Sequence, residues 1–96
     1  MAKVKILGVS RKTGTYEGFD YDNIMFHATF TADGMIAGDA VKAYKLKTVR
    51  LLDAFEDSKT PQPVKELKDL KQLIGHTVRL IMDDFGKYVD EVQFIK

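Results

Sequence analysis

Five side chains between residues 11 and 21 combine positive charge with aromatic rings: Arg11, Lys12, Tyr16, Phe19 and Tyr21. Proteins that bind single-stranded nucleic acids use cations to follow the phosphates and aromatic faces to stack on bases, and each stacked base contributes about 1–3 kcal/mol. The alternative is that the rings fold back onto the core while Arg11 and Lys12 are merely solvated. Three rings within six residues of a glycine-containing segment are hard to bury together, so the segment is a candidate nucleic-acid site.

A second basic stretch begins at residue 42 and holds four cations in nine residues together with one tyrosine. Its members are Lys42, Tyr44, Lys45, Lys47 and Arg50. Cations spaced in this way along a strand can hold a phosphate backbone. Lysines also keep exposed strand edges soluble, and that simpler interpretation has comparable weight.

A third candidate group lies near the C-terminus and consists of Phe85, Lys87 and Tyr88. The neighbouring carboxylates of Asp83 and Asp84 weaken it, because they repel phosphates. An isolated turn with one cation and two rings is usually just a turn. The group gains interest if it lies close to residues 11–21 in the fold.

Catalytic and metal-binding chemistry has little support in the sequence. The absence of cysteine excludes disulfides, cysteine-based zinc sites and thiol catalysis. His27 and His76 have no metal-ligand or triad spacing, and Asp83 and Asp84, as neighbours on a strand, point to opposite faces. Walker, Rossmann and nucleophile-elbow motifs do not occur. We therefore expect a protein that is not an enzyme and that uses no cofactor, metal or small-molecule substrate.

The length and composition are those of one globular domain spanning residues 1–96. The chain has 45% hydrophobic and 30% charged residues and a net charge of +1. Residues 1–50 carry eight Lys or Arg against five Asp or Glu, whereas the remainder carries seven against nine. No apolar run approaches the roughly 18 residues needed to span a bilayer, and no signal-type segment begins the chain. We expect a cytoplasmic protein that does not bind membranes.

Three strands are predicted in the first half of the chain by alternating apolar and polar residues. They cover residues 3–9, residues 23–30 with Ile24, Phe26, Ala28 and Phe30 inward, and a segment from residue 37 or 40 to residue 47. Residues 10–22 lack periodicity and predict either a long loop or a loose extension of both flanking strands. The Ala-Asp-Gly sequence at residues 32–34 predicts the reversal before the third strand.

Helical segments are predicted between residues 48 and 75. Residues 48–56 suit a short helix with Thr48 as N-cap and Val49, Leu52 and Phe55 on one side, or a continuation of the third strand. Residues 58–63 form a loop. A stripe of leucines then predicts a helix over residues 64–74, with Pro63 near its first turn and Gly75 just beyond its end.

A closing β-hairpin is predicted over residues 77–95. Val78, Leu80 and Met82 alternate with polar residues, the Asp-Phe-Gly sequence at residues 84–86 supplies the reversal, and a second run follows from residue 87. Five strands with one secure helix between the third and the fourth predict an OB-fold barrel. An open α+β sheet is the alternative. In an OB-fold the first loop and the last turn lie on the same side of the barrel and flank one groove.

Three segments resemble the small single-stranded DNA-binding proteins of filamentous phages and related mobile elements: KVKI at the start, RKTGTYEGFDYDN after it, and IGHTVRLIMDDFGKYVDEVQFIK at the end. The resemblance covers about half of the chain. Those proteins are similar OB-folds that coat single strands, usually as dimers. The resemblance therefore implies DNA as the preferred nucleic acid and a homodimer. The predicted helix over residues 64–74 differs from the family, in which this connection is briefer.

The resulting hypothesis is a non-catalytic protein that binds single-stranded DNA or RNA. Cations of the third strand would hold the backbone, while Tyr16, Phe19, Tyr21 and either Phe85 or Tyr88 would take the bases. The alternative is a protein-interaction or self-assembly module with the same barrel and no nucleic-acid binding. Outward apolar residues such as Met25 and Ile81 suit that alternative, because they leave part of the barrel surface apolar.

Overall fold

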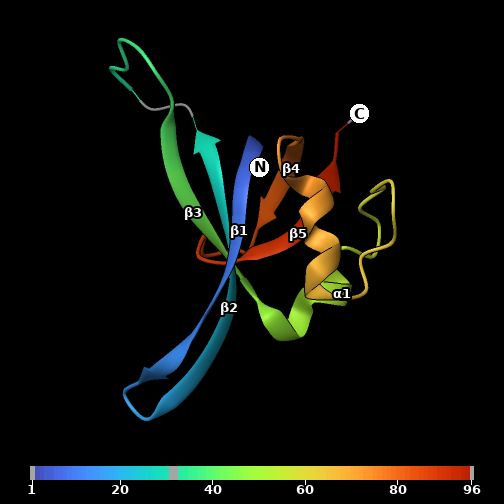
Figure 1. Ribbon diagram of the computed structural model, residues 1–96. Coiled ribbons are helices and arrows are strands. Elements are labelled where there is room, and N and C mark those ends of the chain that lie inside the picture. Colours follow the sequence, from blue (N-terminus) through green and yellow to red (C-terminus); the bar gives the residue numbers. More distant parts are fainter. Residues whose placement is uncertain (1, 31–32, 96) are drawn as a thin grey trace.

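Five antiparallel strands form one sheet in the computed structural model, which describes residues 2–30 and 33–95 (Figure 1). The strands are β1 (Ala2–Tyr16), β2 (Phe19–Phe30), β3 (Ala40–Lys47), β4 (Thr77–Met82) and β5 (Val89–Phe94). Their order across the sheet is β3-β2-β1-β4-β5. The predicted mainly β fold, with five strands and a helical connection between the third and the fourth, is confirmed.

The sheet is not closed into a barrel. Within the described residues, the edge strand β3 pairs with the chain next to β5 only through one isolated parallel bridge, between Lys45 and Tyr88. The outer edge of β5 is partly taken by another segment, because the Phe94 N–H donates to the Ser58 carbonyl oxygen over 2.8 Å. The predicted closed barrel is therefore not confirmed, and the two edges meet at a single point.

Residues 10–22 extend β1 and β2 into one long hairpin. The pairing runs without interruption from Ser10 opposite Met25 to Tyr16 opposite Phe19. The two turn residues, Glu17 and Gly18, both have positive φ, 50° and 82°, as in the type I′ turns whose twist suits two-residue hairpins. The strand-extension alternative is thus confirmed and the long loop is wrong. The hairpin projects beyond the rest of the sheet at the bottom of Figure 1.

Glu17 offers a test of this turn. A side chain other than glycine at positive φ costs about 1 kcal/mol, and asparagine tolerates the conformation best. We expect Glu17→Asn to slow hydrogen exchange of the amides around the turn by about fivefold. Gly18→Ala should speed the same exchange, since Gly18 has φ of 82°. Exchange rates measured by NMR that do not change in either variant would contradict this account of the turn.

A bulge in β1 decides which side chains of the hairpin face outward. The register shifts between Ile6 and Gly8, and Leu7 is left with 45% of its surface exposed. Beyond the bulge, Arg11 lies opposite the buried Ile24 and therefore shares the inner face of the sheet. The next residue, Lys12, consequently faces outward. The sequence pattern of residues 3–9 gives no sign of this change of face.

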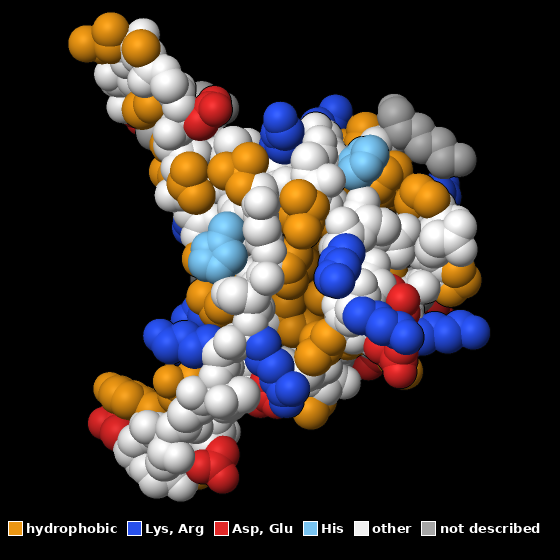
Figure 2. Space-filling view, in the orientation of Figure 1, with side chains coloured by type: hydrophobic (Ala, Val, Ile, Leu, Met, Phe, Trp, Pro, Cys, Tyr) orange, Lys and Arg blue, Asp and Glu red, His pale blue; other side chains and the backbone are white. Residues whose placement is uncertain are grey.

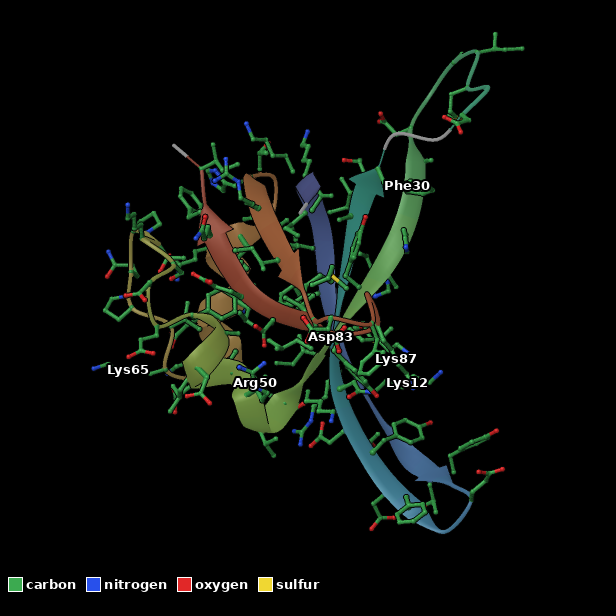
Figure 3. All side chains as sticks on the ribbon, turned by 180° about the vertical axis from the view of Figure 1, so that it is seen from behind. Lys12, Phe30, Arg50, Lys65, Asp83 and Lys87 are labelled. Carbon is green, nitrogen blue, oxygen red and sulfur yellow. The ribbon has the colours of Figure 1, made fainter. Side chains whose placement is uncertain are left out.

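The hydrophobic core lies against the inner face of the sheet. Its fully buried members include Ile6, Phe26, Leu46 and Leu80. Phe30 was also expected to face inward, into the core, but its side chain is not buried there, because Phe30 is 36% exposed. Phe30 continues the alternation of β2, but it is the last residue of that strand and lies on the projecting arm that β2 and β3 form with the loop between them, beyond the core (Figure 3).

A short helix follows β3, as one of the two alternatives predicted. It consists of a 3-10 turn, η1 (Thr48–Arg50), and α1 (Leu51–Ala54). Thr48 is not the N-cap, because its hydroxyl donates to the Asp22 carboxylate over 2.8 Å instead. The predicted inner face is wrong for Val49 and Leu52, which are exposed, and right for Phe55, which is buried. The α-helical part starts only at Leu51, and the segment buries Leu51 and Ala54 together with the predicted Phe55.

The leucine stripe forms a 3-10 helix, η2 (Leu67–Leu73), drawn as the orange coil in Figure 1. Its leucines recur every three residues, which matches the 3.0 residues per turn of this helix better than the predicted α-helix. It starts at Leu67 rather than near Pro63, because the Asp69 carboxylate accepts the N–H groups of Lys65 and Glu66, each over 2.9 Å. Gly75 follows it with φ of 84°, as its predicted position requires.

The predicted closing hairpin is confirmed as β4 and β5. Its turn is held by the Asp83 carboxylate, which accepts the N–H of Lys87 over 2.9 Å, and Gly86 has φ of 66°. At the β2–β3 reversal, Asp33 and Gly34 lie in a turn, while Ala32 is outside the described residues. No helix within residues 2–30 and 33–95 is long and apolar enough to cross a bilayer.

Candidate nucleic-acid interface

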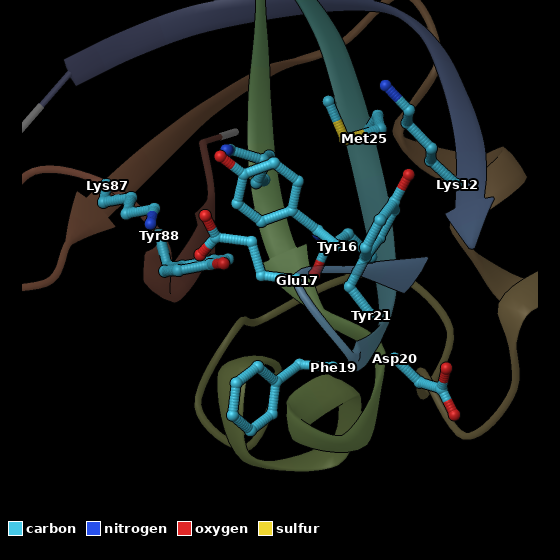
Figure 4. Close-up of a pocket in the computed structure, with 11 residues that line it drawn as sticks. Lys12, Tyr16, Glu17, Phe19, Asp20, Tyr21, Met25, Lys87 and Tyr88 are labelled. Carbon is cyan, nitrogen blue, oxygen red and sulfur yellow. The ribbon is translucent and has the colours of Figure 1, made fainter. Parts of the chain in front are cut away.

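A groove of about 460 Å³ lies between the first hairpin, the outer face of β2 and β3, and the residues just before β5 (Figure 4). We call it the hairpin groove. Three lysines line it: Lys12, Lys45 and Lys87. Four aromatic residues also line it: Tyr16, Phe19, Tyr21 and Tyr88. The first hairpin and the turn before β5, which are far apart in the sequence, therefore border one groove.

Tyr21 lies close against the backbone of β1. It lies opposite Gly14 across the hairpin, and a Cβ atom on Gly14 would come within 2.6 Å of the Tyr21 Cζ atom. Glycine at this position thus allows the ring to lie directly on the β1 backbone. One face of the ring is fixed in this way while the residue borders the groove.

Tyr16 and Phe19 form the last pair of the hairpin, on either side of its turn. They are 70% and 78% exposed, respectively. The predicted alternative, that the aromatic side chains of this segment fold back onto the core, is wrong for both residues. Their place at the end of an arm leaves no core within reach.

Lysines from two parts of the chain lie around the ring of Tyr88. The Nζ atoms of Lys47, Lys87 and Lys45 lie 4.9, 5.5 and 5.6 Å from the centroid of its ring, within the range of cation–π attraction. Lys45 and Lys47 come from β3, whereas Lys87 belongs to the last turn. Figure 4 shows Lys87 beside Tyr88, with Lys12 on the other side of the groove. The ring therefore concentrates positive charge at one end of the groove.

Two predicted cations are engaged in ion pairs outside the groove. The Arg11 guanidinium binds the Asp22 carboxylate through Nε at 2.9 Å and through a second nitrogen at 2.5 Å. Arg50 pairs with Asp90 at 2.6 Å. Arg11 lies on the inner face because of the bulge in β1. Both arginines thus connect neighbouring elements.

Four further predicted residues lie away from the lining of the hairpin groove. Tyr44 is buried in the core, and the Nζ atom of Lys42 lies 5.2 Å from its ring centroid. Phe85 is 92% exposed at the tip of the last turn. Lys47 touches Tyr88 but lines two smaller hollows beside it. Of the third predicted group, Lys87 and Tyr88 reach the groove and Phe85 does not.

The ion pair of Arg11 and Asp22 predicts a pH dependence of stability. The hydrogen bonds from Arg11 and Thr48 lower the pKa of Asp22 from 3.8 to about 2. A carboxyl group with a lowered pKa stabilises the folded state above its unfolded value, and this contribution is lost as the pH falls through the folded value. We expect the free energy of unfolding to fall between about pH 4 and pH 2.

Asp22→Asn should remove part of this fall, and urea unfolding at several pH values would measure it. The folded-state pKa values of Asp69 and Asp83 are also lowered, by backbone N–H groups, so some pH dependence should remain in the variant. A variant with the same pH dependence as the wild type would contradict the role of Asp22.

Sequence reasoning missed four residues as parts of this groove: Glu17, Asp20, Asn23 and Met25. Met25 was predicted to face outward, and its position opposite Lys45 places it on the groove side of β2. Glu17 and Asp20 bring carboxylates to the far end of the hairpin. Phosphates are repelled there and attracted to the lysines around Tyr88. The alternation of β2 already placed Met25 on the outward face. Recognising that this face borders the groove also requires the pairing of β2 with β3.

The two histidines lie outside the hairpin groove. The Ser10 Oγ and His27 Nε2 atoms are 2.8 Å apart, and within the described residues no carboxylate accepts a hydrogen bond from His27. His76 packs on Phe94 with 5.2 Å between the ring centroids. Across residues 2–30 and 33–95, no three His, Asp or Glu side chains form a potential metal site.

Comparison with known proteins yields no match to a family model, a curated protein or a solved structure. The chemistry of the groove is therefore inferred from its own residues. The groove combines three lysines with four aromatic residues, two of which, Tyr16 and Phe19, are largely exposed.

Proposed function

We propose that this protein binds single-stranded nucleic acid in the hairpin groove without catalysing a reaction. The observation that carries the proposal is the convergence of Lys12, Lys45 and Lys87 with four aromatic residues in one groove. Single-strand binders combine a positively charged path for the backbone with rings for successive bases. The resemblance to phage proteins favours DNA over RNA, and we include DNA in the proposal.

We further infer that the sheet is a partly open OB-fold. In support, the parallel bridge between Lys45 and Tyr88 lies where β3 and β5 approach each other, and a helix connects β3 to β4. OB-folds bind oligonucleotides on the face of strands 2 and 3 and at the loops after strands 1 and 4. The hairpin groove occupies the corresponding surfaces of this sheet.

In this proposal the lysines around Tyr88 bind phosphates, and the bases stack toward the first hairpin. Lysine ammonium groups carry charge without a fixed hydrogen-bonding plane. Stacking accepts every base, because every base has a flat face. We therefore expect weak sequence preference and strong salt dependence.

Tyrosine fluorescence tests the proposal directly, since the chain has four tyrosines and no tryptophan. Tyr16, Tyr21 and Tyr88 line the groove, so oligo-dT should quench most of the emission at low salt and high salt should restore it. Heparin, a polyanion without bases, is the control and should quench less at saturation. Unchanged fluorescence with micromolar protein at low salt, together with no mobility shift of labelled oligo-dT, would overturn the proposal.

Self-assembly is a second candidate function. Of the two residues first assigned to a partner surface, Met25 lines the hairpin groove and Ile81 is partly buried in β4. A different set of apolar residues, on the β2–β3 arm, favours this function more strongly.

A further inference from the structure

The arm between β2 and β3 ends in an exposed apolar tip flanked by acidic residues. We define the tip as residues 33–39. Ile36 is fully exposed at 100%, and Met35 is 46% exposed. Asp33 and Asp39 flank them, and the tip contains no Lys or Arg. Figure 1 shows the tip projecting away from the sheet, and Figure 2 shows apolar atoms at its end.

A second groove, between β1 and η2, is lined by apolar and basic residues and so complements the apolar, acidic tip. This η2 groove has a volume of about 290 Å³. Its apolar lining includes Val9, Leu67 and Ile74, and Ile74 is 48% exposed. Figure 2 shows apolar side chains in a strip between the sheet and the helical segment, bordered by basic ones. The groove is apolar at its floor and open to solvent.

The charges around the η2 groove are positive. Its lining includes Arg11, Lys68 and Lys71 and no carboxylate. Arg11 is already paired with Asp22, and the Lys68 Nζ lies 3.2 Å from a Glu66 carboxylate oxygen. Lys71 has no ion-pair partner among the described residues. An acidic ligand would therefore find its strongest counterpart in Lys71.

We propose that the tip of one molecule docks in the η2 groove of a second copy. Ile36 and Met35 would leave water against Leu67 and Ile74, while Asp33 or Asp39 approaches Lys71. The arm points away from its own η2 in Figure 1, so the contact joins two molecules. Such a contact uses two different surfaces and is heterologous, and it propagates as an open chain unless the rotation closes a ring. The inference does not depend on nucleic-acid binding.

Sedimentation velocity in nucleic-acid-free buffer at low salt tests the contact. The wild type should form a concentration-dependent series of oligomers that high salt weakens. Ile36→Ser and Lys71→Glu should each weaken association at least tenfold. Both residues are exposed, so the fold should persist, and circular dichroism would check it. Leu52→Ser and Lys65→Glu are matched controls, because they change an exposed leucine and an exposed lysine outside both surfaces and should associate like the wild type.

Mixing the two interface variants provides the decisive result. The Ile36→Ser protein retains an intact groove and the Lys71→Glu protein retains an intact tip. An equimolar mixture should therefore form a heterodimer and no larger species. A wild type that stays monomeric up to millimolar concentration, variants that associate like the wild type, or a mixture without heterodimer would each overturn the proposal. Association of the wild type with an acidic apolar peptide but not with itself would also overturn it and indicate a different partner.

Discussion

Replacing Lys12, Lys45 and Lys87 together by glutamine is expected to weaken oligo-dT binding by roughly two to three orders of magnitude at about 50 mM salt. These lysines line the hairpin groove from three separate elements, and in the proposed function each neutralises one phosphate. For single strands, each neutralised phosphate contributes about 0.7 to the slope of log affinity against log salt. The triple variant should therefore lose about two units of slope. Titrations of labelled oligo-dT at several salt concentrations measure both quantities.

Lys42→Gln supplies the matched control for charge. Lys42 belongs to the same strand as Lys45, but it lies near Tyr44 and outside the lining of the groove. Its replacement should change affinity and salt slope little. If Lys42→Gln reduced the slope as much as Lys45→Gln does, binding would depend on the overall charge of β3, and the hairpin groove would not be the site.

The positions of the strands were largely predictable because their signals are local. Alternation located β2, β4 and β5, and the Asp-Phe-Gly turn located the last reversal. Local signals also predicted a helix at the leucine stripe. Its type required attention to the spacing, since residues 67, 70 and 73 recur with a period of three.

The face of the sheet on which Arg11 and Lys12 lie could not be predicted, because it depends on the bulge at Leu7. A bulge is a property of two paired strands, and the sequence of one strand gives no register. The same limit applies to Tyr44, whose neighbours made the face of β3 ambiguous. It also explains why local patterns could not show whether the sheet closes: the hydrogen bond from Phe94 to Ser58 at the edge of β5 joins segments that no local pattern relates.

The residues of the candidate site also differ in whether local sequence was enough to predict them. Residue types alone identified Lys12, Tyr16, Phe19 and Tyr21 as one group, and these residues do line one groove. The same group also included Arg11, and cation density selected Arg50, but these two arginines form ion pairs with Asp22 and Asp90. Whether a cation is available to a phosphate depends on its partners, and partners distant in sequence become visible in the fold.

Tyr21→Ala is expected to weaken oligo-dT binding by about 5- to 150-fold, the equivalent of one stacked base. The ring of Tyr21 rests on Gly14, so little conformational freedom remains to be lost when a base stacks on its open side. Tyr21→Phe keeps the flat face and should bind within about twofold of the wild type. Anisotropy of labelled oligo-dT measures the affinities without relying on tyrosine emission. Equal losses in both variants would show that the hydroxyl, not the stacking face, is what matters.

Gly14→Ala gives an independent test of the same ring, because it leaves Tyr21 unchanged in sequence. The added Cβ would collide with the ring and force it off the β1 backbone. Affinity should fall by several-fold and the loss should not add to that of Tyr21→Ala, since both changes remove one platform. Non-additivity in this double-mutant cycle would link the loss to the position of the ring. Fully additive losses would mean that Gly14 acts elsewhere, and Tyr21 would then bind bases, if at all, without its support from β1.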